Sequence, residues 1–276
     1  MLSAVLIISS IGLICGVVLV IAAKVLAVPV DEKAVKIREC LPGANCGACG
    51  FAGCDDYAKN LAANPELKPN LCVPGGAAAS KTIAEILGVV AEETVPTKAY
   101  VRCSGTPDKA PLSMDYDGPK SCSASKMYFG GRKNCAYGCL GYGDCVAACK
   151  FDAMHIVDGI ASVDRDACVG CAACAKACPN GLIAMLPETS LIAVGCSSHD
   201  KGAAVMKACD VGCIGCMKCV KTCEHGAISV TNFLASIDPE KCVNCGKCAE
   251  VCPRHIIHKV TDGACAGCPG CASKAG

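Results

Sequence analysis

Two cysteine runs near the end of the chain constrain the fold more than any other feature. They are Cys213-x2-Cys216-x2-Cys219-x3-Cys223 and, 29 residues further on, Cys242-x2-Cys245-x2-Cys248-x3-Cys252-Pro253. In this spacing the first three thiolates of each run bind one 4Fe–4S cube, and the fourth thiolate binds the cube of the other run. The two runs therefore predict one folding unit with two clusters.

This unit occurs twice in the chain. A shift of 74 residues, without a gap, places residues 133–141 on residues 207–215. The shift also aligns cysteines along both copies, namely Cys122, Cys135, Cys139, Cys145, Cys149, Cys168, Cys171, Cys174 and Cys178 with Cys196, Cys209, Cys213, Cys219, Cys223, Cys242, Cys245, Cys248 and Cys252. A duplicated two-cluster module is therefore the predicted centre of the protein.

The composition agrees with cores built around inorganic clusters. The 276 residues include 29 Cys but no Trp and only four Phe. Metal-ligand spacing of this kind indicates a reducing compartment rather than a disulfide framework. The formal charge is +1, but four thiolates on a cube leave about −2 per cluster, or about −10 for five clusters. The loaded protein is expected to be acidic, which argues against nucleic acid as a partner.

The first residues predict a membrane anchor. Residues 2–23 carry no charged side chain, and 22 helical residues would reach about 33 Å, enough to cross a bilayer core. A cleaved signal peptide and a buried soluble helix are the alternatives, but the basic n-region of a signal peptide is missing. Lys24, Lys33, Lys36 and Arg38 follow the apolar run. This predicts a single-pass protein of the cytoplasmic membrane with its cluster domains on the cytoplasmic side.

A second kind of cysteine pattern follows the anchor. Its spacing is Cys-x2-Cys-x4-Cys-x17-Cys, formed by Cys46, Cys49, Cys54 and Cys72. Four thiolates in one short segment can close a 4Fe–4S cube without help from another run. A zinc site is the alternative, because zinc also accepts four thiolates.

The first module departs from the ferredoxin spacing at one ligand. Tyr142 stands where the second copy has Cys216, and Lys150 follows Cys149 where proline is common. We expect Cys135 to replace the missing thiolate, so that Cys135, Cys139, Cys145 and Cys178 hold one cube. Cys168, Cys171, Cys174 and Cys149 would then hold the other.

The end of the chain leaves a choice open. Cys265, Cys268 and Cys271 have the spacing of a three-ligand half-run. Either they bind a sixth cluster with Cys103 as the fourth ligand, or they are three free thiols in a terminal segment rich in Gly and Ala.

We expect an α+β fold. The segments are a transmembrane anchor (1–28), a four-cysteine 4Fe–4S domain (29–92), ferredoxin-like modules (93–190 and 191–260) and a cysteine-rich tail (261–276). A helix is predicted over 79–90, a linker over 91–99, and hairpins over 156–163, with an Asp-Gly turn, and over 228–237. No Ser/His/Asp set, paired carboxylates or dinucleotide loop is found, so no catalytic residue is assigned.

The order of these parts resembles a known family. An apolar N-terminal helix, then Leu41-Pro-Gly-Ala-Asn-Cys46-Gly-Ala-Cys49-Gly-Phe-Ala-Gly-Cys54 with Cys72-Val-Pro-Gly-Gly, then ferredoxin modules, is similar to the B subunit of the Rnf electron-transport complex. The second module and the cysteine-rich tail resemble the longer form of that subunit in anaerobic bacteria.

The resemblance implies a role in electron transfer. The subunit would accept electrons from soluble reduced ferredoxin and relay them through five 4Fe–4S clusters, or six, to the other Rnf subunits. That complex reduces NAD+ and moves Na+ or H+ across the membrane. Two alternatives are a polyferredoxin subunit of another membrane oxidoreductase, such as a hydrogenase, and a corrinoid-linked iron–sulfur protein, for which no corrinoid-binding domain is seen.

Overall fold

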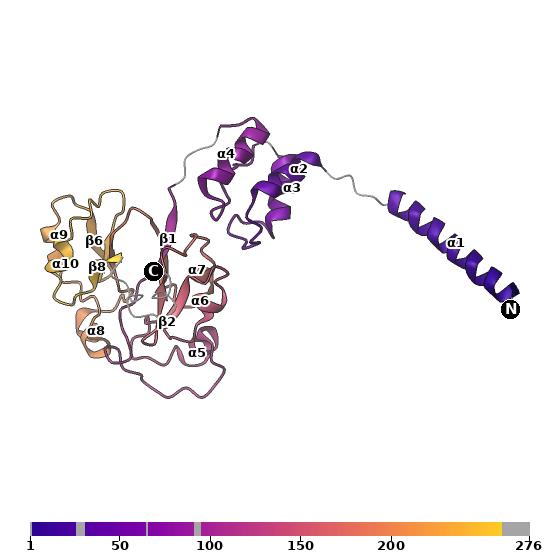
Figure 1. Cartoon of the computed structure of the whole chain (residues 1–276). Helices are drawn as coiled ribbons and strands as arrows, with labels where there is room; N and C mark the ends of the chain where they lie inside the picture. The colour runs from indigo at the N-terminus through magenta and orange to yellow at the C-terminus, as the bar shows by residue number, and fades with distance from the viewer. Residues whose placement is uncertain (1, 26–30, 65, 91–94, 261–276) are drawn as a thin grey trace, which may run out of the picture.

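The chain divides into an N-terminal helix, a small helical domain and two modules of short strands and helices (Figure 1). The computed structural model describes residues 2–25, 31–64, 66–90 and 95–260. The first helix, α1, covers Leu2–Val25, and its side chains are described at residues 9–10 and 12–22. Among the described residues, no helix has the length and apolar character that crossing a membrane requires.

The helical domain packs three helices around one small core. They are α2 (Glu32–Cys40), α3 (Cys54–Ala63) and α4 (Gly76–Leu87). Ile37, Tyr57, Leu61 and Ile83, with relative exposures of 1% or less, form its centre. The Tyr57 hydroxyl donates to the carbonyl oxygen of Lys68 at 3.0 Å and accepts from the Leu71 N–H at 3.3 Å. These bonds fix the loop that carries Cys72 against α3.

The expected helix over 79–90 is displaced by three residues. It begins at Gly76 and ends at Leu87, because Gly88 adopts a left-handed conformation with φ of 71°. The N–H groups of Gly88 and Val89 both bond to the Ala84 carbonyl. A glycine in this conformation ends a helix by satisfying its last carbonyl groups.

The two modules contain four two-stranded antiparallel sheets. In the first module β1 (Thr97–Val101) pairs with β4 (Ile183–Pro187), and β2 (Met154–Val157) pairs with β3 (Ile160–Val163). In the second module β5 (Ile192–Val194) pairs with β8 (Ile257–Lys259), and β6 (Ile228–Thr231) pairs with β7 (Leu234–Ile237). Short helices connect the strands, namely α5 (Cys122–Phe129), α6 (Asp144–Ala147), α7 (Ala173–Ala177), α8 (Gly202–Ala208), α9 (Lys218–Thr222) and α10 (Lys247–Glu250).

The hairpins predicted from the sequence are confirmed. In the first module Asp158 and Gly159 form the turn with φ values of 49° and 73°. In the second module Asn232 and Phe233 occupy the equivalent turn with φ values of 49° and 63°. Two consecutive positive φ values are the geometry of a type I′ turn, which matches the twist of the flanking strands.

The linker expected over 91–99 is shorter than predicted. Residues 91–94 lie outside the described residues, and β1 already begins at Thr97. Ala99 and Tyr100 of this strand are buried. Tyr100 packs with Ala193 of β5 and with Val260 in a small apolar cluster, so the sheets β1–β4 and β5–β8 of the two modules contact each other.

The loop of the first module that carries Cys171 is packed closely against β1. Gly170 has φ of +72°, and a Cβ atom placed there would lie 3.2 Å from the Thr97 carbonyl carbon and still closer to its oxygen. The 74-residue equivalent of Gly170 is Asn244, also at positive φ, whose side chain instead bonds to the Leu191 N–H and the Thr189 carbonyl. Glycine is therefore required in the first copy by the close approach of β1.

We expect Gly170→Ala to destabilise the first module. A left-handed backbone costs a residue with a Cβ about 1–2 kcal/mol, and the contact with Thr97 adds to this cost. The control is Gly246→Ala, where φ is +81° and no atom lies within 4 Å of the added Cβ. Thermal unfolding should show a larger loss of melting temperature for Gly170→Ala than for the control. Equal losses would contradict the role assigned to the contact.

Candidate iron–sulfur sites

The second module gathers one complete ligand set of the predicted ferredoxin type. A cavity with an open volume of about 350 Å³ is lined by Cys213, Cys216, Cys219 and Cys252. Burial, together with the neighbouring acidic groups Cys213, Cys216 and Cys252, raises the pKa of Cys219 to about 11. The structure thus brings together the first three cysteines of one run and the fourth of the other.

The remaining cysteines of this module follow a turn fixed by Asp238. Its carboxylate accepts from the Glu240 N–H at 3.0 Å, and its carbonyl accepts from the Cys242 N–H at 3.1 Å. Burial raises the pKa of Cys248, and the nearby thiols of Cys242 and Cys245 act in the same direction. Cys223, the predicted fourth ligand, follows α9.

The first module places Cys122, and not Cys135, in the corresponding cavity. This cavity has an open volume of about 360 Å³, and its lining includes Cys122, Cys139, Cys145 and Cys178. Burial raises the pKa of Cys145 to about 12, with Cys139, Cys122 and Cys178 among the groups that raise it. The sequence predicted that Cys135 lies beside Cys139 and Cys145. In the structure Cys122 lines the cavity with them, and Cys135 does not.

A single carboxylate positions Cys122. Asp144 accepts from the N–H groups of Cys122 and Ser123 at 2.9 and 3.0 Å, and from the Ser121 and Ser123 hydroxyls at 3.0 and 2.9 Å. Burial alone would raise the pKa of Asp144, but these donors lower it overall. Because Asp144 immediately precedes Cys145, it ties the start of α5 to the loop that carries two cavity cysteines.

Tyr142, which replaces a cysteine in the first copy, has its ring engaged by other side chains. The Arg132 guanidinium lies 4.5 Å from the centroid of the ring. Tyr116 contacts the same ring edge-on, with centroids 5.8 Å apart.

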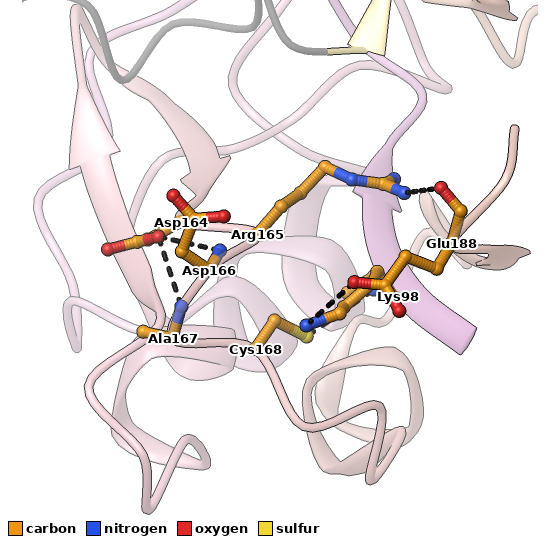
Figure 2. Close-up of polar contacts among 8 residues, drawn as sticks. Lys98, Asp164, Arg165, Asp166, Ala167, Cys168 and Glu188 are labelled. Atoms are coloured by element: carbon orange, nitrogen blue, oxygen red, sulfur yellow. Dashed lines mark hydrogen bonds and ion pairs between the residues drawn. The ribbon is translucent and has the colours of Figure 1, made fainter. Parts of the chain in front are cut away.

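Four other cysteines of the first module, Cys149, Cys168, Cys171 and Cys174, lie near one another. Cys168 is held by an Asp164 turn, in which the carboxylate accepts from the N–H groups of Asp166 and Ala167 at 2.9 and 3.2 Å (Figure 2). The Ala99 N–H of β1 donates to Cys168 Sγ at 3.4 Å. Burial, together with the neighbouring thiols of Cys168, Cys171 and Cys149, raises the pKa of Cys174 to about 11.

Two charged side chains contact Glu188, the residue that directly follows β4 (Figure 2). Lys98 Nζ lies 3.6 Å from Glu188 Oε1, and Arg165 donates to the Glu188 carbonyl at 3.5 Å. The Arg165 contact therefore joins the loop to the end of β4, whereas the Lys98 contact links the two strands of the sheet.

The helical domain brings together the four cysteines predicted for it. Burial raises the pKa of Cys72, and Cys54, Cys49 and Cys46 raise it as neighbouring acidic groups. Asn45 Oδ1 accepts from the Cys54 N–H at 2.8 Å, which links the loop of Cys46 to the start of α3.

This ligand set lies next to the first module. Cys46 is among the neighbours that raise the pKa of Cys171, after burial. Lys150 Nζ donates to the carbonyls of Ala44 and Asn45 at 3.3 and 3.0 Å. The lysine that departs from the ferredoxin pattern therefore connects the first module to the loop of Cys46.

Cys135 and Cys103 line a third cavity, together with Cys196 and Cys209, in a volume of about 400 Å³. Cys265, Cys268 and Cys271 of the tail lie outside the described residues, so the expected pairing of Cys103 with them is not placed. Within the described ranges, no three His, Cys, Asp or Glu side chains stand close enough together to share a single metal ion. In a 4Fe–4S cube each thiolate binds a different iron, so its four ligands surround a volume of several atoms.

A second match within the sequence shows that Cys103, and not Cys122, corresponds to Cys196. Val101-Arg-Cys103-Ser104 and Val194-Gly-Cys196-Ser197 match at a shift of 93 residues. Both segments directly follow equivalent strands, β1 and β5. The structural counterpart of Cys196 is thus Cys103, and Cys122 belongs to a stretch of the first copy that the second copy lacks.

Family models match three parts of the chain. Residues 41–74 match a model described as a putative Fe–S cluster, residues 160–183 match a 4Fe–4S binding domain, and residues 212–256 match a 4Fe–4S dicluster domain. These matches cover the helical domain and both modules, so the chain carries multiple 4Fe–4S clusters.

Three curated relatives align along most of the chain. The B subunit of the Na+-translocating ferredoxin:NAD+ oxidoreductase complex of Acetobacterium woodii is 43% identical over 89% of this chain and 74% of its own length. The B subunit of the proton-translocating complex of Clostridium ljungdahlii is 40% identical over 92% and 90%. The B subunit of the ion-translocating oxidoreductase complex of Methanosarcina acetivorans is 41% identical over 93% and 97%. The chain belongs to the family of B subunits of ion-translocating ferredoxin:NAD+ oxidoreductase complexes.

Proposed function

We propose that this protein relays electrons from reduced ferredoxin through its 4Fe–4S clusters to the other subunits of an ion-translocating ferredoxin:NAD+ oxidoreductase complex. The observation that carries this proposal is the 40–43% identity, over about nine tenths of the chain, to three B subunits. Two are named for ferredoxin:NAD+ oxidoreductase complexes and one for an ion-translocating oxidoreductase complex. The alternatives of a hydrogenase polyferredoxin and a corrinoid-linked protein have no comparable support. The names of the relatives include both Na+ and proton coupling, and either ion is compatible with a subunit that handles only electrons.

Five ligand sets follow from the spacing and from the cavities. They are Cys46, Cys49, Cys54 and Cys72; Cys122, Cys139, Cys145 and Cys178; Cys149, Cys168, Cys171 and Cys174; Cys213, Cys216, Cys219 and Cys252; and Cys223, Cys242, Cys245 and Cys248. Cys122 replaces Cys135 in this proposal because it lines the cavity that Cys139, Cys145 and Cys178 share. A bound 4Fe–4S cube supplies one-electron redox chemistry at a potential that the surrounding protein sets.

The chain itself contributes hydrogen bonds to the ligand sulfurs. Backbone N–H groups of Ala161, Ala153 and Leu182 donate to the Sγ atoms of Cys139, Cys149 and Cys178 at 3.3 to 3.4 Å. Such bonds stabilise the more negative, reduced form of a site and raise its potential. Half of the twenty ligand cysteines are buried, which keeps water away from the iron, whereas Cys216 and Cys245 of the second module are exposed. The second module therefore presents ligands of both its sets to the surface, where a redox partner could approach.

The anchor and the segment boundaries belong to the same proposal. The uncharged residues 2–23 would hold the chain in the cytoplasmic membrane, with the basic residues after them on the cytoplasmic side. The segments are the anchor over 1–28, the four-cysteine domain over 29–92, the modules over 93–190 and 191–260, and the tail over 261–276. Soluble ferredoxin would then reach the cluster domains from the cytoplasm.

The proposal predicts that reduced ferredoxin reduces this protein directly. The full-length chain, purified without oxygen and oxidised, should lose visible absorbance and gain EPR signals when ferredoxin kept reduced by an enzyme is added. Ferredoxin without the chain is the control. A chain that dithionite reduces but ferredoxin does not would refute the role of electron acceptor.

The altered ligand set predicts that Cys122→Ala removes one cluster. About four irons and four sulfides per chain should be lost, because an alanine leaves the cube with three protein ligands. Cys40→Ala is a matched control, since Cys40 lies on α2 and its thiol bonds to the Lys36 carbonyl. An unchanged iron content in Cys122→Ala would exclude Cys122 as a ligand.

The contact made by Lys150 predicts a kinetic effect without loss of iron. Lys150→Met removes both hydrogen bonds to the loop of Cys46, each worth on the order of 1 kcal/mol at a partly exposed position. Hydrogen exchange in residues 43–49 should accelerate, and electron transfer between the four-cysteine domain and the first module should slow several-fold. The exposed Lys176 of α7 supplies the control Lys176→Met. Identical exchange and rates in the two variants would show that the contact does not position the domain.

A further inference from the structure

We propose that Cys103, Cys135, Cys196 and Cys209 bind an additional 4Fe–4S cluster between the two ferredoxin modules. This inference extends the proposed electron relay and uses none of the twenty cysteines assigned above. It also gives Cys103 and Cys135 ligand partners different from those that the spacing suggested.

The four cysteines come from four separate segments that meet at one cavity. Cys103 follows β1, Cys135 lies shortly before Cys139, Cys196 follows β5, and Cys209 follows α8. A Cβ atom placed at Gly105 would lie 3.3 Å from Cys209 Sγ and 3.9 Å from Cys103 Sγ. Sulfurs contributed by the two modules thus lie close to a single glycine.

The thiols also influence one another. Burial, together with the neighbouring thiols of Cys103, Cys209 and Cys196, raises the pKa of Cys135 to about 11. Burial raises the pKa of Cys209 as well, with Cys103 among its neighbours. All four are free cysteines in the structure, so no disulfide explains why they gather here.

The arrangement is approximately symmetric between the two modules. The Cys139 N–H donates to Cys103 Sγ at 3.4 Å, and the Cys213 N–H donates to Cys196 Sγ at 3.3 Å. Cys139 and Cys213 are equivalent under the 74-residue shift, and so are Cys135 and Cys209. Each module therefore contributes one pair of cysteines in the same geometry.

The dimensions of this cavity match those of its neighbours. Its open volume of about 400 Å³ compares with about 360 and 350 Å³ for the two cavities whose cysteines have ferredoxin spacing. Gly105, Gly138, Gly195 and Gly212 line it, and glycines let the backbone approach a bulky group closely. A ligand of the same size and chemistry as in the neighbouring sites fits these observations.

Positive charge stands close to the cavity. Lys133, which is 4% exposed, donates to the carbonyl of the lining residue Gly105 at 2.6 Å. Arg254 donates to the Cys209 carbonyl at 2.7 Å, and its charge favours the Cys209 thiolate. A buried ammonium group requires a compensating negative charge. A cube with four thiolates, with a net charge of about −2, would provide it.

The location gives the site a function. The N–H of Cys139, a proposed ligand of the first module, and the N–H of Cys213, a proposed ligand of the second, both point at sulfurs of this set. Electrons that pass between the modules would therefore have a redox site halfway, next to a ligand set on each side.

Iron and sulfide counts in double variants test the inference. In a full-length parent with Cys265, Cys268 and Cys271 changed to Ala, we expect about 24 irons per chain for six cubes. Cys135→Ala, Cys209→Ala and the Cys135→Ala/Cys209→Ala double variant should each retain about 20, because both residues bind the same cube. The Cys122→Ala/Cys135→Ala double variant should retain about 16, and Cys40→Ala should retain all of them.

Other outcomes would overturn the inference. A count of about 24 in the Cys135→Ala/Cys209→Ala variant would show that these residues bind no iron. A count of about 20 in the Cys122→Ala/Cys135→Ala variant would place both residues on one cluster. About 20 irons in the parent, or one zinc in place of four irons, would also refute the inference. These counts are made on the parent alone, so they do not depend on the folding of a variant at the cavity. A parent with 20 irons that ferredoxin still reduces would refute this inference alone, whereas a parent that ferredoxin cannot reduce would refute the proposed function.

Discussion

Bonds between buried thiolates and iron are the interaction on which both modules depend. Each module core contains buried cysteines, such as Cys145 and Cys174 in the first module and Cys219 and Cys248 in the second. Burial raises the pKa of these thiols, so they would remain protonated at neutral pH without a metal. Because iron displaces those protons, the free energy of cluster binding is also free energy of folding. Short strands and four- to eight-residue helices then suffice to build a module.

The sequence predicted the features that local spacing determines. Cys213 to Cys252 follow the ferredoxin pattern, and the hairpins were visible as strand pairs around Asp158-Gly159 and at its counterpart in the second copy. The 74-residue shift could not align Cys103 with Cys196. The first copy has 19 more residues between Cys103 and Cys135 than the second copy has between Cys196 and Cys209. A comparison without gaps therefore aligned Cys122 with Cys196. Only the strand that precedes each cysteine, β1 or β5, shows which of them are equivalent.

The departures of the first copy from the ferredoxin pattern are related to one another. Loss of a cysteine at Tyr142 removes one ligand of the module, and the additional residues between Cys103 and Cys135 supply Cys122 at the same cavity. Asp144, next to Cys145, fixes the added segment through four hydrogen bonds. Lys150 replaces the usual proline and contacts the four-cysteine domain. Each change adjusts the first module to its position between two other redox units.

The order of the sites along the molecule follows from these contacts. The set of Cys46 adjoins Cys171, the two sets of the first module share that module's core, and Cys139 adjoins Cys103. On the other side of the symmetric cavity, Cys196 adjoins Cys213, and the last set of the second module includes the exposed Cys245. A site at the junction would stand next to a ligand set of each copy. With a pair of cysteines from each copy at that junction, the duplication yields one continuous path from the four-cysteine domain to the surface of the second module.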